Sequence, residues 1–272
     1  MQVSVDRLTL VGFKVDYKIH NLLNDVTFDL IQKRYRAEYP YEWRYELFGG
    51  GVLEIGSLQD QSNIRLDFNP NNVKEGRHLD MIHRLIGCMK YIKPTRVDVA
   101  IDIKNIDMND YAIIDDLSRK TNEWRSGGSR RLETYYIGGA SSDLRIRIYD
   151  KALEQGEKGD WWRIEAQMRK EFAENYKQFN PFESITLVPK NASLEQFQTL
   201  KEKVFIKHLL QTPDDLGQLA QNTRYKYKKI LKDLAESNSN KIDFYSIYEE
   251  YKSAINYTLY SYIKHSHINN VF

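Results

Sequence analysis

Three short segments of the chain alternate apolar and polar residues. They are Arg96–Asp102 (RVDVAID), Leu144–Lys151 (LRIRIYDK) and Trp161–Arg169 (WWRIEAQMR). Because side chains on a β-strand repeat with a period of two, alternate residues share one face. The polar faces of these predicted strands carry Arg96, Asp98 and Asp102; then Arg145, Arg147, Tyr149 and Lys151; then Arg163, Glu165, Gln167 and Arg169. If the strands are neighbours, one sheet face gathers carboxylates, a tyrosine and many positive charges.

Turn signals connect the second and third segments to their surroundings. A strand at 134–137 is followed by Gly138-Gly139 and then by the segment from Leu144, which predicts a hairpin. The glycine-bearing stretch 155–159 then leads to the strand at Trp161. Three sequential antiparallel strands follow from this pattern, with Tyr149 near the end of the middle one. We therefore expect Tyr149 and Glu165 on adjacent strands.

The remaining pattern predicts an α+β fold: a curved, largely antiparallel sheet with inserted helices, followed by a helical C-terminal region. Residues 1–70 predict strands, with a turn at Gly49-Gly50-Gly51. Helices are predicted at 78–90 and 108–119, a polar loop at 122–128, and further helices at 194–211, 223–232 and 242–264. We expect a sheet-based catalytic domain over 1–180 and a helical region over 181–272. Helix-start signals occur at Thr212 and Pro213.

Composition limits the class of protein. The 272 residues are 41% hydrophobic and 29% charged, with a net charge of +2, so any nucleic-acid binding depends on where the charges lie. The single cysteine, Cys88, excludes a disulfide framework and a cysteine-based zinc site within one chain. No secretory signal and no apolar run near the ~20 residues of a membrane span is present. We expect a cytoplasmic protein with no membrane partner.

Tyr149 is the candidate nucleophile of the polar face. Arg147 and Lys151 share that face, where they would favour the phenolate and hold a phosphate. A phenol with an ordinary pKa near ~10 needs such help at neutral pH. The alternative is a structural tyrosine on the polar face of a sheet.

Asp98, Asp102 and Glu165 are the candidate metal ligands. Mg²⁺ or Mn²⁺ prefers oxygen ligands and is usually held by one or two carboxylates together with water and substrate phosphate. The alternative is ion pairing across strands with Arg96, Arg145, Arg147 or Arg163. Spacing alone leaves both interpretations open.

A basic, tyrosine-bearing run lies in the C-terminal region. Its cations could follow a DNA backbone, and a solvated helix face is the alternative. The candidates for DNA binding there are Arg224, Lys226, Lys228 and Lys229. His265-Ser266-His267 lies near the end of the chain and is interpreted as a tail, and no zinc-site spacing emerges from the other histidines.

Taken in order, four segments resemble a known family. They are the segment at 96–102, Tyr135-Tyr136-Ile137-Gly138, Arg147-Ile148-Tyr149-Asp150-Lys151 and Trp162-Arg163-Ile164-Glu165. They are similar to the replication initiation factors of rolling-circle plasmids, the Rep_trans group of Gram-positive bacteria. The motif region spans about residues 40–175.

The resemblance implies a specific activity. Such initiators bind the double-strand origin of their plasmid, usually as dimers, and help to extrude a hairpin. One tyrosine, Tyr149 here, attacks a phosphodiester of the plus strand and becomes a 5′-phosphotyrosine, while the freed 3′-OH primes synthesis. A plasmid helicase is recruited, and the protein rejoins the displaced strand after one round.

The resemblance also assigns roles to the polar face. Metal binding by acidic side chains is carried over to Asp98 and Glu165, and to Asp102, with Mg²⁺ or Mn²⁺ as the ion. The charge that develops on the phosphate would be stabilised by Arg145, Arg147, Lys151 and Arg163. Two other functions remain open: a non-catalytic origin or operator binder, and a metal-dependent nuclease that uses water.

Overall fold

A computed structural model describes residues 1–14, 19, 22, 31–38, 41–47, 49–56, 64–73, 75–238 and 241–264. The chain folds into two compact units. Unit 1 contains Met1–Gln2, Ile101–Ala166 and Asn180–Glu250, and unit 2 contains Val3–Ala100, Gln167–Phe179 and Tyr251–Phe272. Strands β6 (Met89–Lys104) and β11 (Trp161–Arg169), and helix α7 (Phe244–Lys264), contribute residues to both units.

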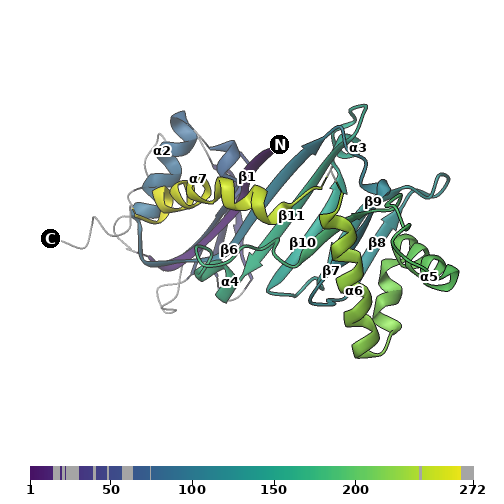
Figure 1. Cartoon of the computed structure of the whole chain (residues 1–272). Helices are drawn as coiled ribbons and strands as arrows, with labels where there is room; N and C mark the ends of the chain where they lie inside the picture. Colours follow the sequence, from purple (N-terminus) through teal and green to yellow (C-terminus); the bar gives the residue numbers. More distant parts are fainter. Residues whose placement is uncertain are drawn as a thin grey trace. The chain divides into compact units, whose positions relative to one another are not determined.

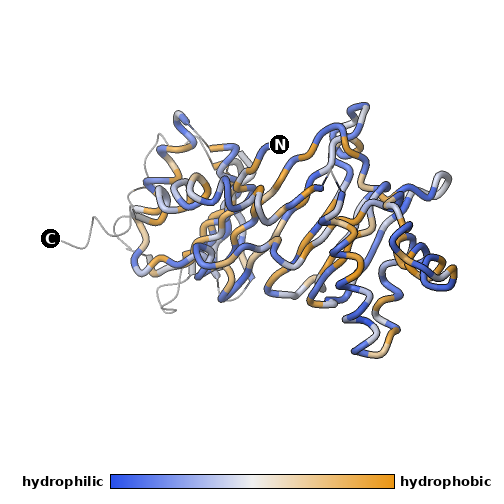
Figure 2. Tube along the Cα trace, in the orientation of Figure 1, coloured by the Kyte–Doolittle hydropathy of each residue, from blue (hydrophilic) through white to orange (hydrophobic). Residues whose placement is uncertain are grey.

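Unit 2 is built on antiparallel strands in the order β2-β3-β4-β5-β1-β6. The first five are β1 (Gln2–Lys14), β2 (Ile31–Arg36), β3 (Trp43–Leu47), β4 (Gly51–Ile55) and β5 (Ile64–Phe68). Hydrophobic and hydrophilic residues are interspersed along the chain, as the colours of Figure 2 show, and they alternate strictly in β3 (WRYEL) and β5 (IRLDF). The β3–β4 turn needs glycine, because Gly49 and Gly50 have φ of 84° and 79°.

Helices cover the apolar face of the unit 2 sheet. Helix α2 (Gly76–Gly87) buries Met81, Ile82, Leu85 and Ile86, which recur at helical spacing. The end of α7 places the ring of Tyr262 5.1 Å from that of Phe68. The short elements η1 (Pro70–Asn72) and α4 (Glu171–Glu174) complete this unit. The predicted strands before residue 70 and the helix near 78–90 are confirmed.

Unit 1 holds the predicted hairpin. Its strand order is β6-β11-β10-β9-β8, with β8 (Thr121–Arg125), β9 (Leu132–Ile137) and β10 (Leu144–Asp150). Strands β9 and β10 pair antiparallel, and Tyr149 lies opposite Thr134. Gly138 begins their turn with φ of 91°, and a Cβ there would lie 2.9 Å from the Leu144 carbonyl oxygen. The antiparallel arrangement around Tyr149 is therefore confirmed.

A second layer of unit 1 packs helices on a small sheet. Strands β7 (Tyr111–Asp115) and β12 (Ile185–Pro189) pair antiparallel and share a core with α5 (Leu200–Gln211) and α6 (Gln221–Glu236). Helix α5 contacts β7, and helix α6, which is labelled in Figure 1, contacts β12. The other short elements are η2 (Met108–Asp110), α3 (Lys151–Gln155) and η3 (Pro213–Gln218). The predicted helices at 223–232 and 242–264 are confirmed.

Three predicted elements are wrong. The helix at 108–119 is instead η2 and strand β7, because Tyr111–Asp115 pairs with a strand distant in sequence. The polar loop at 122–128 overlaps strand β8, whose exposed side chains lack hydrophobic alternation and whose one partner is β9. The helix predicted from residue 194 begins at Leu200, after Thr199 accepts a hydrogen bond from the Glu202 amide at 3.2 Å.

The region after residue 180 contains strand β12 as well as helices. The division into functional domains at 180/181 stays a prediction, since the compact units combine segments from both sides of it. No helix in the described residues is long and apolar enough to span a bilayer. The interpretation of His265 and His267 as a tail lies outside the described residues.

Candidate active site

Tyr149 lies at the end of β10, directly before helix α3. Asp150 begins that helix, and its side chain accepts a hydrogen bond from the Leu153 amide at 2.9 Å. The Arg147 guanidinium lies 3.8 Å from the centre of the Tyr149 ring, as expected for two residues on one strand face. Tyr149 is 4% exposed, so its ring is held firmly between its neighbours.

Burial raises the pKa of Tyr149 above its ordinary value. Arg163 and Arg147 act against this effect, whereas the carboxylates of Glu154 and Glu165 add to it. Arg147 favours the phenolate, as predicted, but its effect on the pKa is smaller than that of burial. Loss of hydration outweighs the attraction of the guanidinium groups, and the phenol stays protonated at neutral pH.

Arg163 and Asp102 form a tight pair in unit 1. Two guanidinium nitrogens of Arg163 donate to the two Asp102 oxygens at 2.8 and 2.6 Å, and the Trp161 indole donates to Oδ1 at 3.1 Å. The side chains are 16% and 11% exposed. This bidentate geometry fixes the Arg163 guanidinium, which is one of the charges acting on Tyr149.

Asp98 is paired in unit 2 in the same manner. The Arg96 guanidinium donates to its carboxylate at 2.5 to 3.1 Å, and Asp98 is 2% exposed. Burial raises the pKa of Asp98, although bonds from Arg96 and Gln167 oppose the rise.

The acidic residues do not fit a formed metal site. Among the described residues, no group of three or more His, Cys, Asp or Glu side chains could hold an ion. Asp98 and Asp102 each give both oxygens to an arginine, as the alternative interpretation of ion pairing expected. Glu165 lies near enough to raise the pKa of Tyr149, but it does not join these pairs into a cluster.

One functional candidate, Glu154, was missed by the sequence reasoning, and a second, Lys151, was placed on the wrong element. Glu154 binds Lys151 and lies 3.9 Å from Arg147, and the charge of Lys151 lowers its pKa against the opposing effect of burial. Lys151 lies in α3 rather than on the extended strand, with its Nζ 5.7 Å from the Tyr149 ring centre. A helical spacing from 151 to 154 was the available signal.

Arg145 stacks on another tyrosine. Its guanidinium lies 4.0 Å from the ring centre of Tyr136, and Tyr136 pairs with Arg147 across the hairpin. Arg145 is thus on the same face as Arg147 but beside a different ring. It stays a predicted DNA contact.

The basic run on α6 divides into inward and outward side chains. Arg224 donates to the carbonyls of Leu216, Gly217 and Leu219, at 2.8 to 3.0 Å, so it closes η3. Lys226 lies 3.5 Å from Glu202, and Lys229 is exposed. Lys228 donates to the carbonyls of Asp115 and Asp116 and to Ser118 Oγ, at 2.5 to 2.8 Å.

These contacts predict different effects for neighbouring lysines. Lys228→Ala should lower the free energy of unfolding by about 1–3 kcal/mol, because it leaves carbonyls of the β7–β8 connection without their donor. Lys229→Ala on the same helix should change stability by less than about 0.5 kcal/mol. Urea unfolding of both variants measures this difference. Equal stability with selective loss of DNA binding in Lys228→Ala would contradict the structural role.

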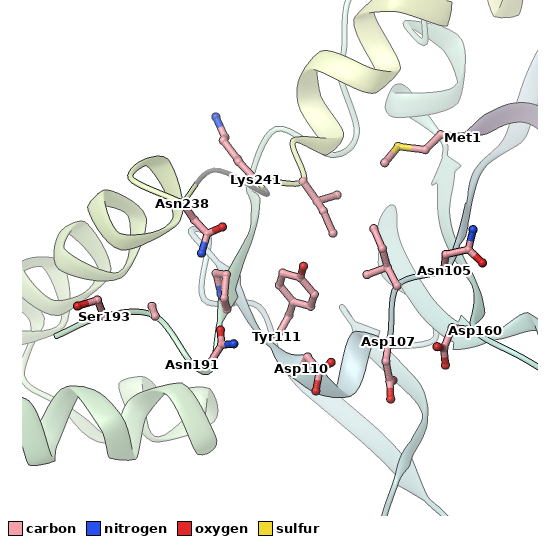
Figure 3. A pocket seen from close by; sticks show the side chains of 14 residues that line it. Met1, Asn105, Asp107, Asp110, Tyr111, Asp160, Asn191, Ser193, Asn238 and Lys241 are labelled. Atoms are coloured by element: carbon pink, nitrogen blue, oxygen red, sulfur yellow. The ribbon is translucent and has the colours of Figure 1, made fainter.

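A separate pocket of about 850 Å³ opens in unit 1. Figure 3 shows the ring of Tyr111 and the carboxylates of Asp107, Asp110 and Asp160 among its lining side chains. Asp107 is engaged by Arg131 at 2.7 Å and by Asn109. Its lining contains none of the predicted catalytic, metal or DNA-binding residues. The candidate site is therefore the polar sheet face around Tyr149 and not this pocket.

Comparison with known proteins gives relatives along most of the chain. No protein-family model matches. Two replication initiation proteins from Staphylococcus aureus are 27% identical over 254 residues and 26% identical over 253 residues. Each alignment covers 86% of this chain and 76% of the relative. The chain is similar over most of its length to replication initiation proteins. The predicted resemblance to this class of initiators is thereby confirmed.

A further replication initiation protein from Staphylococcus aureus is 25% identical over 253 residues. Among solved structures, that of a rolling circle replication initiator protein from Geobacillus stearothermophilus aligns with 16% identity and a TM-score of 0.48. The alignment covers 89% of this chain and 99% of that chain. The alignments with the Staphylococcus aureus replication initiation proteins cover more than four fifths of the chain, so they extend across the position of Tyr149.

Proposed function

We propose that the protein initiates rolling-circle replication of a plasmid by nicking and rejoining DNA through Tyr149. The proteins to which it is similar are replication initiation proteins, which supports a role at an origin. The observation that supports the chemistry is the setting of Tyr149: the Arg147 guanidinium is 3.8 Å from its ring, and Arg163 acts on it while fixed by Asp102. A phenol beside two fixed cations is suited to attack on a phosphodiester.

The proposed step conserves every atom. The Tyr149 hydroxyl oxygen bonds to the phosphorus of a plus-strand phosphodiester, and the bond from phosphorus to the 3′ oxygen breaks. The products are a 5′-phosphotyrosine and a free 3′-OH, which primes synthesis. The phenol proton passes to the solvent before attack, and the leaving 3′ oxygen takes up a proton from the solvent. Attack of a 3′-OH on the phosphotyrosine reverses the step and rejoins the strand.

Fixed cations would stabilise the charge that develops on the phosphate. Arg147 and Arg163 are the nearest candidates, because both act on Tyr149 in the free protein. Lys151 is held by Glu154 and Arg145 stacks on Tyr136, so they would contact phosphates beside the reacting one. Phosphate binding near Arg147 would also change the stacking that now buries the Tyr149 ring.

The proposal extends to partners carried over from the resemblance. The protein would bind the double-strand origin as a dimer, help to extrude a hairpin and recruit a plasmid helicase in the cytoplasm. A requirement for Mg²⁺ or Mn²⁺ belongs to the proposal as well. In the described structure both Asp98 and Asp102 are held by arginines.

The deciding experiment uses a supercoiled plasmid that carries this gene with its flanking DNA. The plasmid is incubated with the protein and Mg²⁺ or Mn²⁺, with an EDTA control, and resolved on a denaturing gel. A nick with a covalent protein–DNA adduct is expected. Nicking without an adduct would instead indicate attack by water, and binding without nicking would indicate a non-catalytic origin or operator binder.

The raised pKa of Tyr149 predicts the pH dependence of adduct formation. Below that pKa the phenolate fraction grows about tenfold for each pH unit, so the rate should rise continuously from about pH 6.5 to 9. The measurement is the initial rate of adduct formation on a single-stranded oligonucleotide that contains the nick site. A rate that is level across this range would contradict the need to generate phenolate and would favour a carboxylate base already ionised.

A further inference from the structure

A ladder of alternating charges crosses the polar face of the unit 2 sheet. Arg44 on β3, Glu54 on β4 and Arg65 on β5 are paired directly by the strand register. Arg44 and Arg65 donate to the two Glu54 oxygens at 2.7 and 2.6 Å. Arg65 also donates to Asp67 at 2.7 Å, and Arg7 on β1 donates to both Asp67 oxygens at 2.8 and 2.9 Å. The ladder therefore connects four neighbouring strands.

The two signs of charge lie at different depths. The side chains of Glu54 and Asp67 are 11% and 4% exposed, whereas those of Arg44, Arg65 and Arg7 are 34%, 28% and 44% exposed. The Arg96–Asp98 pair on β6 repeats this order, with 22% and 2%. Carboxylates thus form an inner layer and guanidinium groups an outer layer. The surface offered to a partner is positive although the ladder as a whole is nearly neutral.

This layering prepares the arginines to bind anions. Arg7 and Arg96 each bind both oxygens of one carboxylate, Arg65 bridges Glu54 and Asp67, and Arg44 makes one bond to Glu54. These bonds orient the guanidinium groups, so less side-chain freedom is lost when a ligand binds. The planar guanidinium has five N–H donors and matches phosphate geometry. We name Arg7, Arg44, Arg65 and Arg96 the arginine row.

We propose that the arginine row binds backbone phosphates of duplex DNA. The proposal rests on the proposed function, which makes DNA the partner, and it adds a binding surface outside the Tyr149 cluster and helix α6. The ladder's arginines offer donors to phosphates. Tyr35 lies opposite Arg44 on the neighbouring strand, and its hydroxyl donates to Glu46 at 2.9 Å. Because an origin is duplex before it is nicked, the proposal commits to duplex DNA, and the test below compares duplex with single-stranded DNA.

The test removes cations and anions in equal number. In Arg7→Gln/Arg44→Gln/Glu54→Gln/Asp67→Asn the net charge is unchanged, and amide groups can keep hydrogen bonds between the strands. Binding to a duplex fragment from the DNA that flanks the gene is measured against salt concentration. Losing two phosphate contacts should lower the slope of log K against log salt by about 1.8 and weaken binding about tenfold or more.

Two further variants serve as a control and as an alternative to the fourfold variant. Lys93→Gln/Glu174→Gln neutralises an exposed ion pair in the same unit, 2.8 Å long, and should bind duplex DNA like the wild type. If the fourfold variant does not fold, Arg44→Gln/Glu54→Gln removes one contact and should lower the slope by about 0.9. Circular dichroism and urea unfolding establish which variants are folded.

The outcomes separate this proposal from the proposed function. A smaller salt slope on duplex DNA, with wild-type adduct formation on a short single-stranded nick-site oligonucleotide, supports the arginine row. An unchanged slope in a folded variant overturns it, as does a loss confined to single-stranded DNA. If the wild-type protein forms no adduct, the proposed nicking function is wrong. The salt slopes on duplex DNA still test whether the arginine row binds phosphates.

Discussion

Tyr149→Phe is expected to abolish the covalent protein–DNA adduct and to reduce nicking at least about a thousandfold, because phenylalanine keeps the ring but has no attacking oxygen. Stability and origin binding should stay close to those of the wild type, since the ring packing against Arg147 is preserved. The measurement is the initial rate of adduct formation on supercoiled plasmid, followed on denaturing gels. DNA binding of the same preparation is measured in parallel.

Tyr136→Phe is the matched control for this substitution. Its ring faces Arg145 at 4.0 Å on the neighbouring strand, an environment similar to that of Tyr149 beside Arg147 at 3.8 Å. Adduct formation by Tyr136→Phe should therefore remain near the wild-type rate. If Tyr149→Phe still cut and joined DNA at the wild-type rate, Tyr149 would not be the nucleophile.

Arg96→Gln is expected to lower the free energy of unfolding by about 3 kcal/mol, because it leaves the buried Asp98 carboxylate without its bidentate partner. Asp98 is 2% exposed, and three contacts of 2.5 to 3.1 Å join it to Arg96. The double variant Arg96→Gln/Asp98→Asn should recover most of the loss, since no buried charge then remains. Urea unfolding of the two variants and the wild type measures the effect.

The deficit of Arg96→Gln should depend on pH with a definite sign. Burial already raises the pKa of Asp98, and removing Arg96 removes an interaction that lowers it. A raised pKa in the folded state favours the protonated form, so stability falls as pH rises from the unfolded value near ~3.9 through the folded one. The deficit should thus be smaller near about pH 5 than near about pH 8.

An exposed pair of the same geometry provides the control for Arg96→Gln. Arg125 and Glu123 are also two residues apart on one strand and are joined by bonds of 2.8 and 2.9 Å, but they are 38% and 40% exposed. Arg125→Gln should cost less than about 1 kcal/mol at either pH. A similar cost for both substitutions would contradict the role assigned to burial of Asp98.

Local patterns predicted those elements whose pairing partners are close in sequence. The hairpin of β9 and β10 follows from alternation and from Gly138-Gly139, and α2 and α6 follow from their spacing. Strand β7 was predicted as helix because its partner β12 lies far along the chain, and its short apolar run fits either structure. Strand β8 was missed because an exposed edge strand needs no hydrophobic alternation.

The sequence predicted which residues lie at the candidate site better than it predicted their electrostatic interactions. Alternation placed Arg147 and Tyr149 on one face, as found. Period-two reasoning could not predict how deeply Tyr149 is buried, and burial decides the direction of its pKa shift. The same reasoning left two partners open for Asp98 and Asp102, a metal ion or an arginine. In the described structure, both carboxylates accept hydrogen bonds from an arginine.

The turn at Gly138 determines which face of the sheet holds the nucleophile. Any side chain there would collide with the Leu144 carbonyl, in a backbone conformation with positive φ. A slip of the hairpin by one residue would turn Tyr149 from the polar face to the apolar one. A substitution at Gly138 would thus behave genetically like a loss of the catalytic tyrosine, although the glycine itself contributes nothing to the chemistry.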